Sequence, residues 1–294
     1  MTTILRLLIS TTLLLAVLGQ AHAHSKSEIT QLITRIRHLP ISQKVQETSE
    51  FFLGDRTRIG PLGEGKKGKF DRDPLFSFKA FDCTTYVETV MALALSQDLK
   101  SFFRNILDIR YRDGIISHQR RNHFTSLDWI PNNAKFLNDI TASIGPIKYA
   151  HAIIDKKSWY QNMGPQNIRR PDVTEQNFRD LLKEFKNLGK DFKPQKATLP
   201  YITLKTLFKN PAHIRNIPHG AIINIVRPNW DLTNSIGTHL NISHQGIAIW
   251  NRGKLYYRHA SSFPHKIVKD TAFKDYFRKY LDSETLKGIN IQEL

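Results

Sequence analysis

The stretch Phe81-Asp82-Cys83-Thr84-Thr85-Tyr86-Val87-Glu88-Thr89-Val90 holds the only cysteine of this 294-residue chain. The residues after it predict a helix over Thr84 to Leu95 that is apolar nearly all round and therefore buried. Cys83 precedes this helix, where unpaired N–H groups and the helix dipole stabilise a thiolate. Position alone leaves three interpretations open: a nucleophile, a buried small apolar residue, or a partner in an intermolecular disulfide.

The first 23 residues have the pattern of a secretory signal. One positive charge at Arg6 precedes an apolar run from Leu7 to about Leu18, and Ala21-His22-Ala23 fits a cleavage site. The run is shorter than the ~20 apolar residues that a membrane span needs. We therefore expect a mature chain from His24 onward, without a later membrane segment, exported to a bacterial periplasm. A lone thiol in an oxidising compartment has no internal disulfide partner.

The chain is strongly basic, with 43 Lys and Arg against 26 Asp and Glu and a formal charge of +17. Loss of Arg6 with the signal leaves 42 against 26, or +16. Such a surface attracts anions. The basic residues are scattered, and no RNA-binding aromatic signature or zinc-finger spacing accompanies them, so we expect no nucleic-acid partner. Acidic cell-wall fragments or lipopolysaccharide are the expected partners of an exported basic protein, and peptides with free carboxylates suit this surface.

Hydrophobic periodicity predicts helices in the first part of the chain and strands in the last part. An α+β fold with an antiparallel sheet follows, with further helices at the N-terminus and in the central region. We expect one domain over 24–294: a helical part and loop (24–80), the Cys83 helix region (81–110), a central region (111–217), and a sheet with a C-terminal helix (218–294). The predicted helices lie within Ser27–Leu53 (interrupted at Pro40), Ser101–Ile109, Phe178–Phe185 and Phe273–Leu281, and the predicted strands at 220–226, 243–250 and 255–261, the last two joined by a turn at 251–254.

Of the twelve histidines, His244 stands out because it lies inside a predicted strand. Alternation places it on one face with Gly246 and Ala248, and such small residues let another element approach closely. We expect that element to be the Cys83 helix, although a satisfied core histidine is an equally good interpretation of the strand alone. His259 on the neighbouring strand is placed to orient the His244 ring. His239 is the reserve for that third position.

The ordered motifs resemble the NlpC/P60 superfamily of papain-like cell-wall hydrolases, and within it the N-acetylmuramoyl-L-alanine amidase-like branch known as DUF1460. The similarity covers nearly the whole mature chain. It rests on Asp82-Cys83-Thr84-Thr85-Tyr86-Val87-Glu88, Ala92-Leu93-Ala94, Ser243-His244-Gln245-Gly246-Ile247-Ala248 and His259-Ala260-Ser261, with Phe52-Leu53-Gly54, Asp128-Trp129-Ile130, Asn132-Asn133 and Leu199-Pro200-Tyr201-Ile202 as further matches. Two departures are Gln245, where valine is usual, and the second histidine at His239.

The resemblance implies a papain-like fold and a cysteine amidase. It assigns Cys83 as nucleophile, His244 as general base and acid, and His259 as the polar orienter. The implied substrate is a peptidoglycan-derived muropeptide, cut between the muramic-acid lactyl group and L-Ala. Asp128 and Trp129 are our predicted substrate-groove residues, with a core aromatic as the equal alternative for Trp129.

Three other functions remain open from the sequence. The same fold could serve an endopeptidase that cuts the γ-D-Glu-diaminopimelate bond, or a wall-binding protein without catalysis. A zinc amidase is suggested by the many histidines, but no His-Glu-x-x-His spacing is present. Gly63-x-Gly65-x-x-Gly68 is formally a dinucleotide fingerprint, yet no predicted strand precedes it. We therefore expect neither metal nor cofactor.

Overall fold

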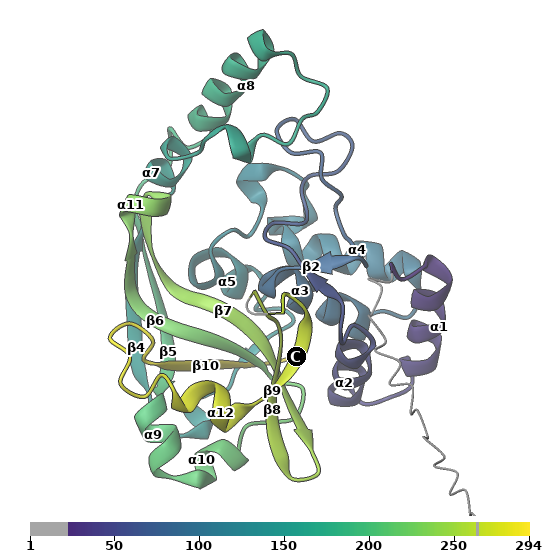
Figure 1. Cartoon of the computed structure of the whole chain (residues 1–294), viewed down its shortest axis with the longest axis vertical. Helices are drawn as coiled ribbons and strands as arrows, with labels where there is room; N and C mark the ends of the chain where they lie inside the picture. The colour runs from purple at the N-terminus through teal and green to yellow at the C-terminus, as the bar shows by residue number, and fades with distance from the viewer. Residues whose placement is uncertain (1–22, 263–264) are drawn as a thin grey trace, which may run out of the picture.

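The computed structural model describes residues 23–262 and 265–294, and the predicted signal segment up to His22 lies outside them. Its main feature is a curved antiparallel sheet with strand order β4-β5-β10-β6-β7-β8-β9, in which β3 also pairs with β10 (Figure 1). The strands are β3 (Asn138–Asp139), β4 (Lys148–Ile154), β5 (Gln195–Thr203), β6 (Ile222–Leu232), β7 (Thr238–Asn251), β8 (Lys254–Ala260), β9 (Val268–Ala272) and β10 (Gly288–Glu293); β1 (Arg56–Thr57) and β2 (Ala80–Phe81) form a separate parallel pair.

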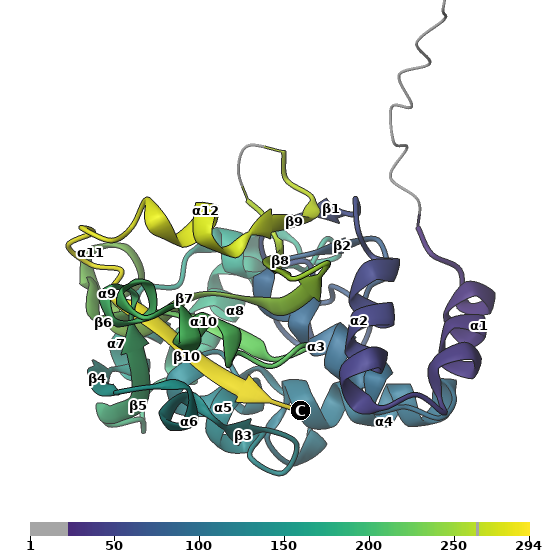
Figure 2. The ribbon, with the colours of Figure 1, turned by 90° about the horizontal axis from the view of Figure 1, so that it is seen from below.

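Helices cover both faces of this sheet. The α-helices are α1 (Lys26–Ile36), α2 (Ile41–Phe51), α3 (Cys83–Ala94), α4 (Leu99–Arg110), α5 (Ile130–Asn132), α6 (Thr141–Ile144), α7 (Lys156–Gln161), α8 (Glu175–Asn187), α9 (Leu204–Lys209), α10 (Pro211–Arg215), α11 (Thr233–Ile236) and α12 (Phe273–Arg278). Short 3₁₀ turns occupy Arg112–Gly114, His118–Arg120 and Pro165–Asn167, and Thr125–Trp129 is a π-helical turn. Figures 1 and 2 place α1–α4 together on one side of the molecule. No helix among the described residues is long and apolar enough to span a bilayer.

The predicted buried helix is present as α3. Asp82 is its N-cap: the Asp82 carboxylate accepts the backbone N–H of Thr85, while the Thr85 hydroxyl accepts the N–H of Asp82. Every residue from Thr85 to Ala94 is buried. These two reciprocal hydrogen bonds between Asp82 and Thr85 therefore fix the helical turn that starts with Cys83.

The N-terminal helices and the hairpin are confirmed as well. The chain turns between α1 and α2 at Pro40, which is the N-cap of α2. Strands β7 and β8 pair up to Asn251 and Lys254, and the two turn residues between them have positive φ values, 47° at Arg252 and 73° at Gly253. These values are those of the tight turns that match the twist of a hairpin.

The end of the chain differs from the prediction of a terminal amphipathic helix. Helix α12 stops at Arg278, and the chain then enters the middle of the sheet as β10, between β5 and β6. The alternation of buried Ile289 and Ile291 with Asn290 and Gln292 is a strand pattern. In the sequence this pattern resembles an exposed edge segment, with one polar face. In the structure Asn290 and Gln292 are buried as well, because they hydrogen bond to one another and to Asp139.

The Cys83 helix packs on the opposite face of β7 from the one predicted. Ile247 and Ile249 share a core cluster with α3, whereas Ala248 belongs to a second cluster with Tyr257 and α12. Gly246 does permit a close approach, but to Tyr257: a Cβ at Gly246 would lie 2.5 Å from the Tyr257 ring and 2.7 Å from the Arg258 carbonyl oxygen. The prediction that the small residues admit the helix is therefore wrong.

We predict that Gly246→Ala destabilises the fold by about 1–3 kcal/mol, because the ring and the carbonyl must both shift. Thermal unfolding should show a midpoint lowered by several degrees. Gly253→Asn is the control, since nothing lies within 4 Å of a Cβ there and asparagine tolerates its positive φ. Equal midpoints for Gly246→Ala and the unmodified protein would contradict the close packing.

Candidate active site

The Cys83 thiol lies against the strand that carries His244. The backbone N–H of Gln245 donates a hydrogen bond to the Cys83 Sγ, and Thr84 also contacts it. Two residues before Gln245, the register of β7 with β6 shifts between Ile225 and Val226, so that β7 has an extra residue at Ser243. Such a bulge bends a strand and re-aims its side chains. His244 lies just after this bulge, in regular register with Ile225, and it lines the same cavity as Cys83, although α3 packs on the other face of β7.

His244 and His259 form the predicted contact between neighbouring strands. The His244 Nε2 lies 2.8 Å from the His259 Nδ1, with the ring planes 88° apart. The other His259 nitrogen lies 3.5 Å from the Thr271 hydroxyl, and the Tyr257 ring stacks on His259 at a centroid distance of 4.9 Å. His259 is thus held from two further sides.

The reserve candidate His239 is not part of this arrangement. It pairs in register with Asp231, near the far end of β7, and its Nε2 lies 3.8 Å from that carboxylate. Five residues of extended strand separate it from His244, or about 17 Å. The geometry therefore favours His259 alone as the neighbour of His244.

Two adjoining cavities meet at His244. The first has a volume of about 710 Å³ and is lined by Cys83, Asp82, Thr84 and the exposed Arg58 and Ile59, together with His244. The second, of about 560 Å³, lies on the other side of His244 and includes His259. Ser243 and His244 line both cavities. The two cavities therefore form one groove, with the His244 imidazole between its two halves.

The thiol and the imidazole are both neutral at rest. Burial, followed by the negative charge of Asp82, raises the pKa of Cys83 to about 11. Burial lowers the pKa of His244 to about 4. Burial, followed by the charges of His244, Lys269 and Lys279, lowers the pKa of His259 to about 3. The expected stabilisation of a thiolate at the helix N-terminus is therefore outweighed by desolvation and by the Asp82 carboxylate.

The predicted substrate-groove residues lie elsewhere. Trp129 is 0% exposed and belongs to the core around α3, which is the alternative interpretation given above. Asp128 is buried too: its carboxylate accepts a hydrogen bond from the Phe124 N–H and forms an ion pair with Lys156 at 2.5 Å. Neither residue lines either half of the groove, so neither belongs to the candidate site.

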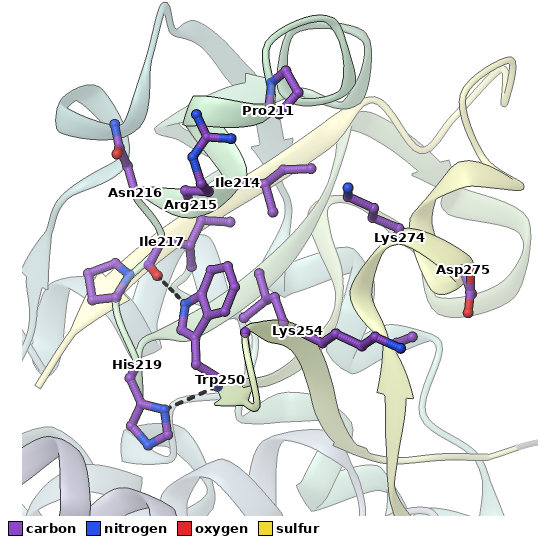
Figure 3. A pocket seen from close by; sticks show the side chains of 14 residues that line it. Pro211, Ile214, Arg215, Asn216, Ile217, His219, Trp250, Lys254, Lys274 and Asp275 are labelled. Atoms are coloured by element: carbon purple, nitrogen blue, oxygen red, sulfur yellow. Dashed lines mark hydrogen bonds between the residues drawn. The ribbon is translucent and has the colours of Figure 1, made fainter.

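A further cavity, of about 950 Å³, is at the opposite end of the β7–β8 hairpin (Figure 3). Trp250 forms one wall, with its indole N–H bonded to the Ile217 carbonyl oxygen at 2.8 Å and its backbone N–H bonded to His219. Lys254, Lys274 and Asp275 lie around the opening. Six strand residues separate Trp250 from His244, or about 20 Å, so this cavity has no part in the thiol–imidazole site.

Two residues that support the thiol–imidazole site, Tyr257 and Gln245, were not predicted from the sequence. Tyr257 shares a strand face with His259, and this alternation is the signal that could have found it. Gln245 supplies the backbone N–H on the thiol, and its side chain donates to Asn224, which in turn donates to Asn290 of β10. That link explains why a polar residue occupies this strand position.

Among the residues that the structure describes, no group of three or more His, Cys, Asp or Glu could hold a metal.

We predict that iodoacetamide alkylates Cys83 slowly at pH 8, because a pKa of about 11 leaves only about 0.1% thiolate there. The rate, followed by intact mass, should rise about tenfold per pH unit up to pH 10.

The matched variant is Asp82→Asn, since asparagine caps a helix equally well but carries no charge. It should increase the rate at pH 8 by about threefold through a lower thiol pKa. A rate plateau reached below pH 7 would show a thiolate–imidazolium pair and contradict the neutral pair.

Comparison with known proteins gives one family and close structural neighbours. Residues 47–283 match the family described as AmiA-like, N-acetylmuramoyl-L-alanine amidase-like. A crystal structure of a Legionella pneumophila protein of the DUF1460 family is 39% identical, with a TM-score of 0.87 over 91% of this chain and 93% of that one. No curated protein matches the sequence.

An N-acetylmuramoyl-L-alanine amidase from Bacteroides uniformis has the same fold, with a TM-score of 0.61 at 24% identity over 86% of this chain and 98% of that one. The family match covers most of the chain and includes Cys83, His244 and His259. The protein therefore belongs to the AmiA-like, N-acetylmuramoyl-L-alanine amidase-like family.

Proposed function

We propose that this protein is a cysteine amidase of the papain-like NlpC/P60 type that cuts the bond between N-acetylmuramic acid and L-Ala in peptidoglycan fragments. Family membership supports an amidase-like enzyme acting on peptidoglycan. The observation that carries the proposal is the 2.8 Å contact between His244 and His259, at a groove that Cys83 also lines. A nucleophile, a base and a group that orients the base are the three parts that such chemistry needs.

The first half of the reaction transfers the acyl group to sulfur. His244 takes the Cys83 proton as Sγ bonds to the lactyl carbonyl carbon, because a neutral thiol needs a base at the moment of attack. The same proton then passes from His244 to the nitrogen of L-Ala, the C–N bond breaks, and the stem peptide leaves as a free amine. A thioester between Cys83 and the lactyl carbonyl remains.

The second half returns the enzyme to its starting state. Water gives a proton to His244 and its oxygen attacks the thioester carbon. The C–S bond breaks, the proton passes to Sγ, and the sugar leaves as its lactyl acid. Backbone N–H groups in the first turn of α3, including that of Cys83, have no partner within the helix. They are placed to stabilise the oxyanion in both halves.

His259 serves as a positioning residue in this mechanism. Its ring contacts the His244 nitrogen that is turned toward β8, which fixes the His244 ring orientation and tautomer. A neutral imidazole stabilises the transient His244 cation less than a carboxylate would. Burial also lowers the pKa of His244, so both effects keep His244 neutral, and able to accept a proton, over a wide pH range.

We also propose export to the periplasm, with cleavage after Ala23. The described structure supports this point of cleavage, because His24 is already held in the fold. Its ring lies 2.9 Å from the Asp55 carboxylate and 4.3 Å from the centroid of Phe51. N-terminal sequencing of the protein from the periplasmic fraction should begin at His24, and an uncleaved cytoplasmic protein would refute the proposal.

Cys83→Ala should abolish hydrolysis, lowering kcat by at least about 10³-fold, since no other thiol is present. Mass spectrometry of a defined muropeptide treated with the unmodified protein should show free sugar and an intact stem peptide.

Three outcomes would reject the proposal. Cleaved peptide with L-Ala still on the sugar indicates an endopeptidase. Full activity of Cys83→Ala excludes the cysteine mechanism, and loss of activity in EDTA with recovery on adding zinc indicates a metal amidase.

The pH profile provides a separate test. Because the pKa of His244 is about 4, kcat/KM should stay level from pH 5 to 8 and fall only near pH 4. Circular dichroism at each pH is the control. Between pH 4 and 6.5 the His244 imidazole is protonated in the unfolded state but neutral in the folded state. The free energy of unfolding therefore decreases as the pH falls through that window. An acid limb near pH 6.5 in folded protein would contradict the buried base.

A further inference from the structure

The half of the groove beyond His244 is lined by cations without acids. Arg227, Lys269 and Lys279 border the 560 Å³ cavity, and no Asp or Glu is among its described lining residues. Its remaining lining residues are aromatic or hydroxyl-bearing, apart from the aliphatic Ile225 and Leu286. The larger cavity near Trp250 differs, because Asp275 is part of its lining. The cavity beside His244 is therefore suited to an anionic ligand.

Two of the three cations are held in place by aromatic rings. The Arg227 guanidinium lies 5.0 Å from the Trp230 ring centroid, and its Nε donates to the Ser243 hydroxyl at 3.1 Å. The Lys279 Nζ lies 5.0 Å from the Tyr276 ring centroid. Stacking orients these side chains without neutralising their charge. Ser243 precedes His244, so the Arg227 contact links the cation directly to the strand position beside the imidazole.

In the described part of the chain, no carboxylate is paired with any of these three cations. Asp270, the residue after Lys269, is engaged by the Arg258 guanidinium at 2.7 Å. Within residues 23–262 and 265–294, none of Arg227, Lys269 and Lys279 forms an ion pair. A carboxylate brought into this cavity would thus meet unneutralised positive charge close to His244.

The direction of proton transfer in the proposed reaction indicates which end of the substrate reaches this cavity. His244 must deliver its proton to the leaving nitrogen, so the part of the substrate that bears this amine extends on the His244 side. The acyl part is bonded to Sγ and extends over the Cys83 cavity, where Ile59 is 85% exposed. In the proposed reaction the amine is L-Ala of the stem peptide. Its next residue, γ-linked D-Glu, keeps a free α-carboxylate.

We propose that Arg227, Lys269 and Lys279 form a subsite for the carboxylates of the leaving stem peptide, and that the sugar occupies the side of Cys83 and Ile59. This assignment rests on the proposed function and deepens it. It makes the enzyme selective for the charge of the second residue of the stem peptide, one residue beyond the L-Ala whose amide bond is cut. The cations act on binding, and none of them touches the reacting atoms.

The test compares two substrates that share the scissile bond: muramoyl-L-Ala-D-Glu and muramoyl-L-Ala-D-isoglutamine, in which the α-carboxylate is an uncharged amide. The unmodified protein should prefer the acid by about tenfold in kcat/KM, with the difference in KM. Lys279→Gln, Lys269→Gln and Arg227→Gln should each reduce that preference by about threefold or more. The preference should also weaken at high salt.

Lys274→Gln is the matched control. Lys274 is an exposed lysine of α12, in the same short segment as Lys279, but it lines the Trp250 cavity (Figure 3). It should leave both the rate and the preference unchanged. Equal kcat/KM for the two substrates, or a preference that all three Gln variants retain, would overturn the subsite.

Binding without turnover separates this inference from the proposed function. Calorimetry on the Cys83→Ala protein with L-Ala-γ-D-Glu and its amidated form should show the same preference and the same loss in Lys279→Gln. Product masses report the bond that is cut. Cleavage elsewhere therefore rejects the proposed amidase, whereas correct cleavage or peptide binding without charge preference rejects the subsite alone.

Discussion

The site depends on one contact between the buried helix and the sheet: the Gln245 N–H on the Cys83 sulfur. It joins the first residue of α3 to the residue after His244, so the thiol and the imidazole share a cavity. Asp82 fixes the helix side of this contact by capping α3. On the sheet side, the Gln245 side chain is bonded to Asn224 and through it to Asn290 in β10. The last strand of the chain thus supports the position of the thiol.

Burial determines the chemistry at this contact. It raises the thiol pKa and lowers that of both imidazoles, so the pair is neutral at rest. A neutral pair avoids isolated charges in a poorly solvated site, which would be costly. The positive charge is placed further along the groove, on side chains stacked against aromatic rings. The groove therefore combines a neutral thiol–imidazole pair with a cationic end.

Local patterns were sufficient to predict α1, α2, α3 and the β7–β8 hairpin, and with them the neighbouring His244 and His259. Each depends on periodicity, a cap or a turn within a few residues. Strand β10 was missed because its polar residues are buried in a network that involves β3 and β6, and such partners are distant in sequence. Trp129 was misplaced as a groove residue because an aromatic side chain suits a core and a sugar site equally. The face of β7 that meets α3 was predicted wrongly because period-two alternation separates the two faces of a strand but does not tell which of two apolar faces a given helix covers; Ile247 and Ile249 pack on α3, and Ala248 packs on the other side.

In the proposed mechanism Cys83 becomes bonded to the sugar side of the substrate while the peptide leaves past His244. Intact-protein mass spectrometry after rapid acid quenching of a muropeptide reaction measures this directly. The expected result is a transient mass increase on Cys83 equal to the glycan with its lactyl acyl group, and no such increase for Cys83→Ala. An adduct that retains L-Ala and D-Glu, or turnover without any adduct on Cys83, would contradict it.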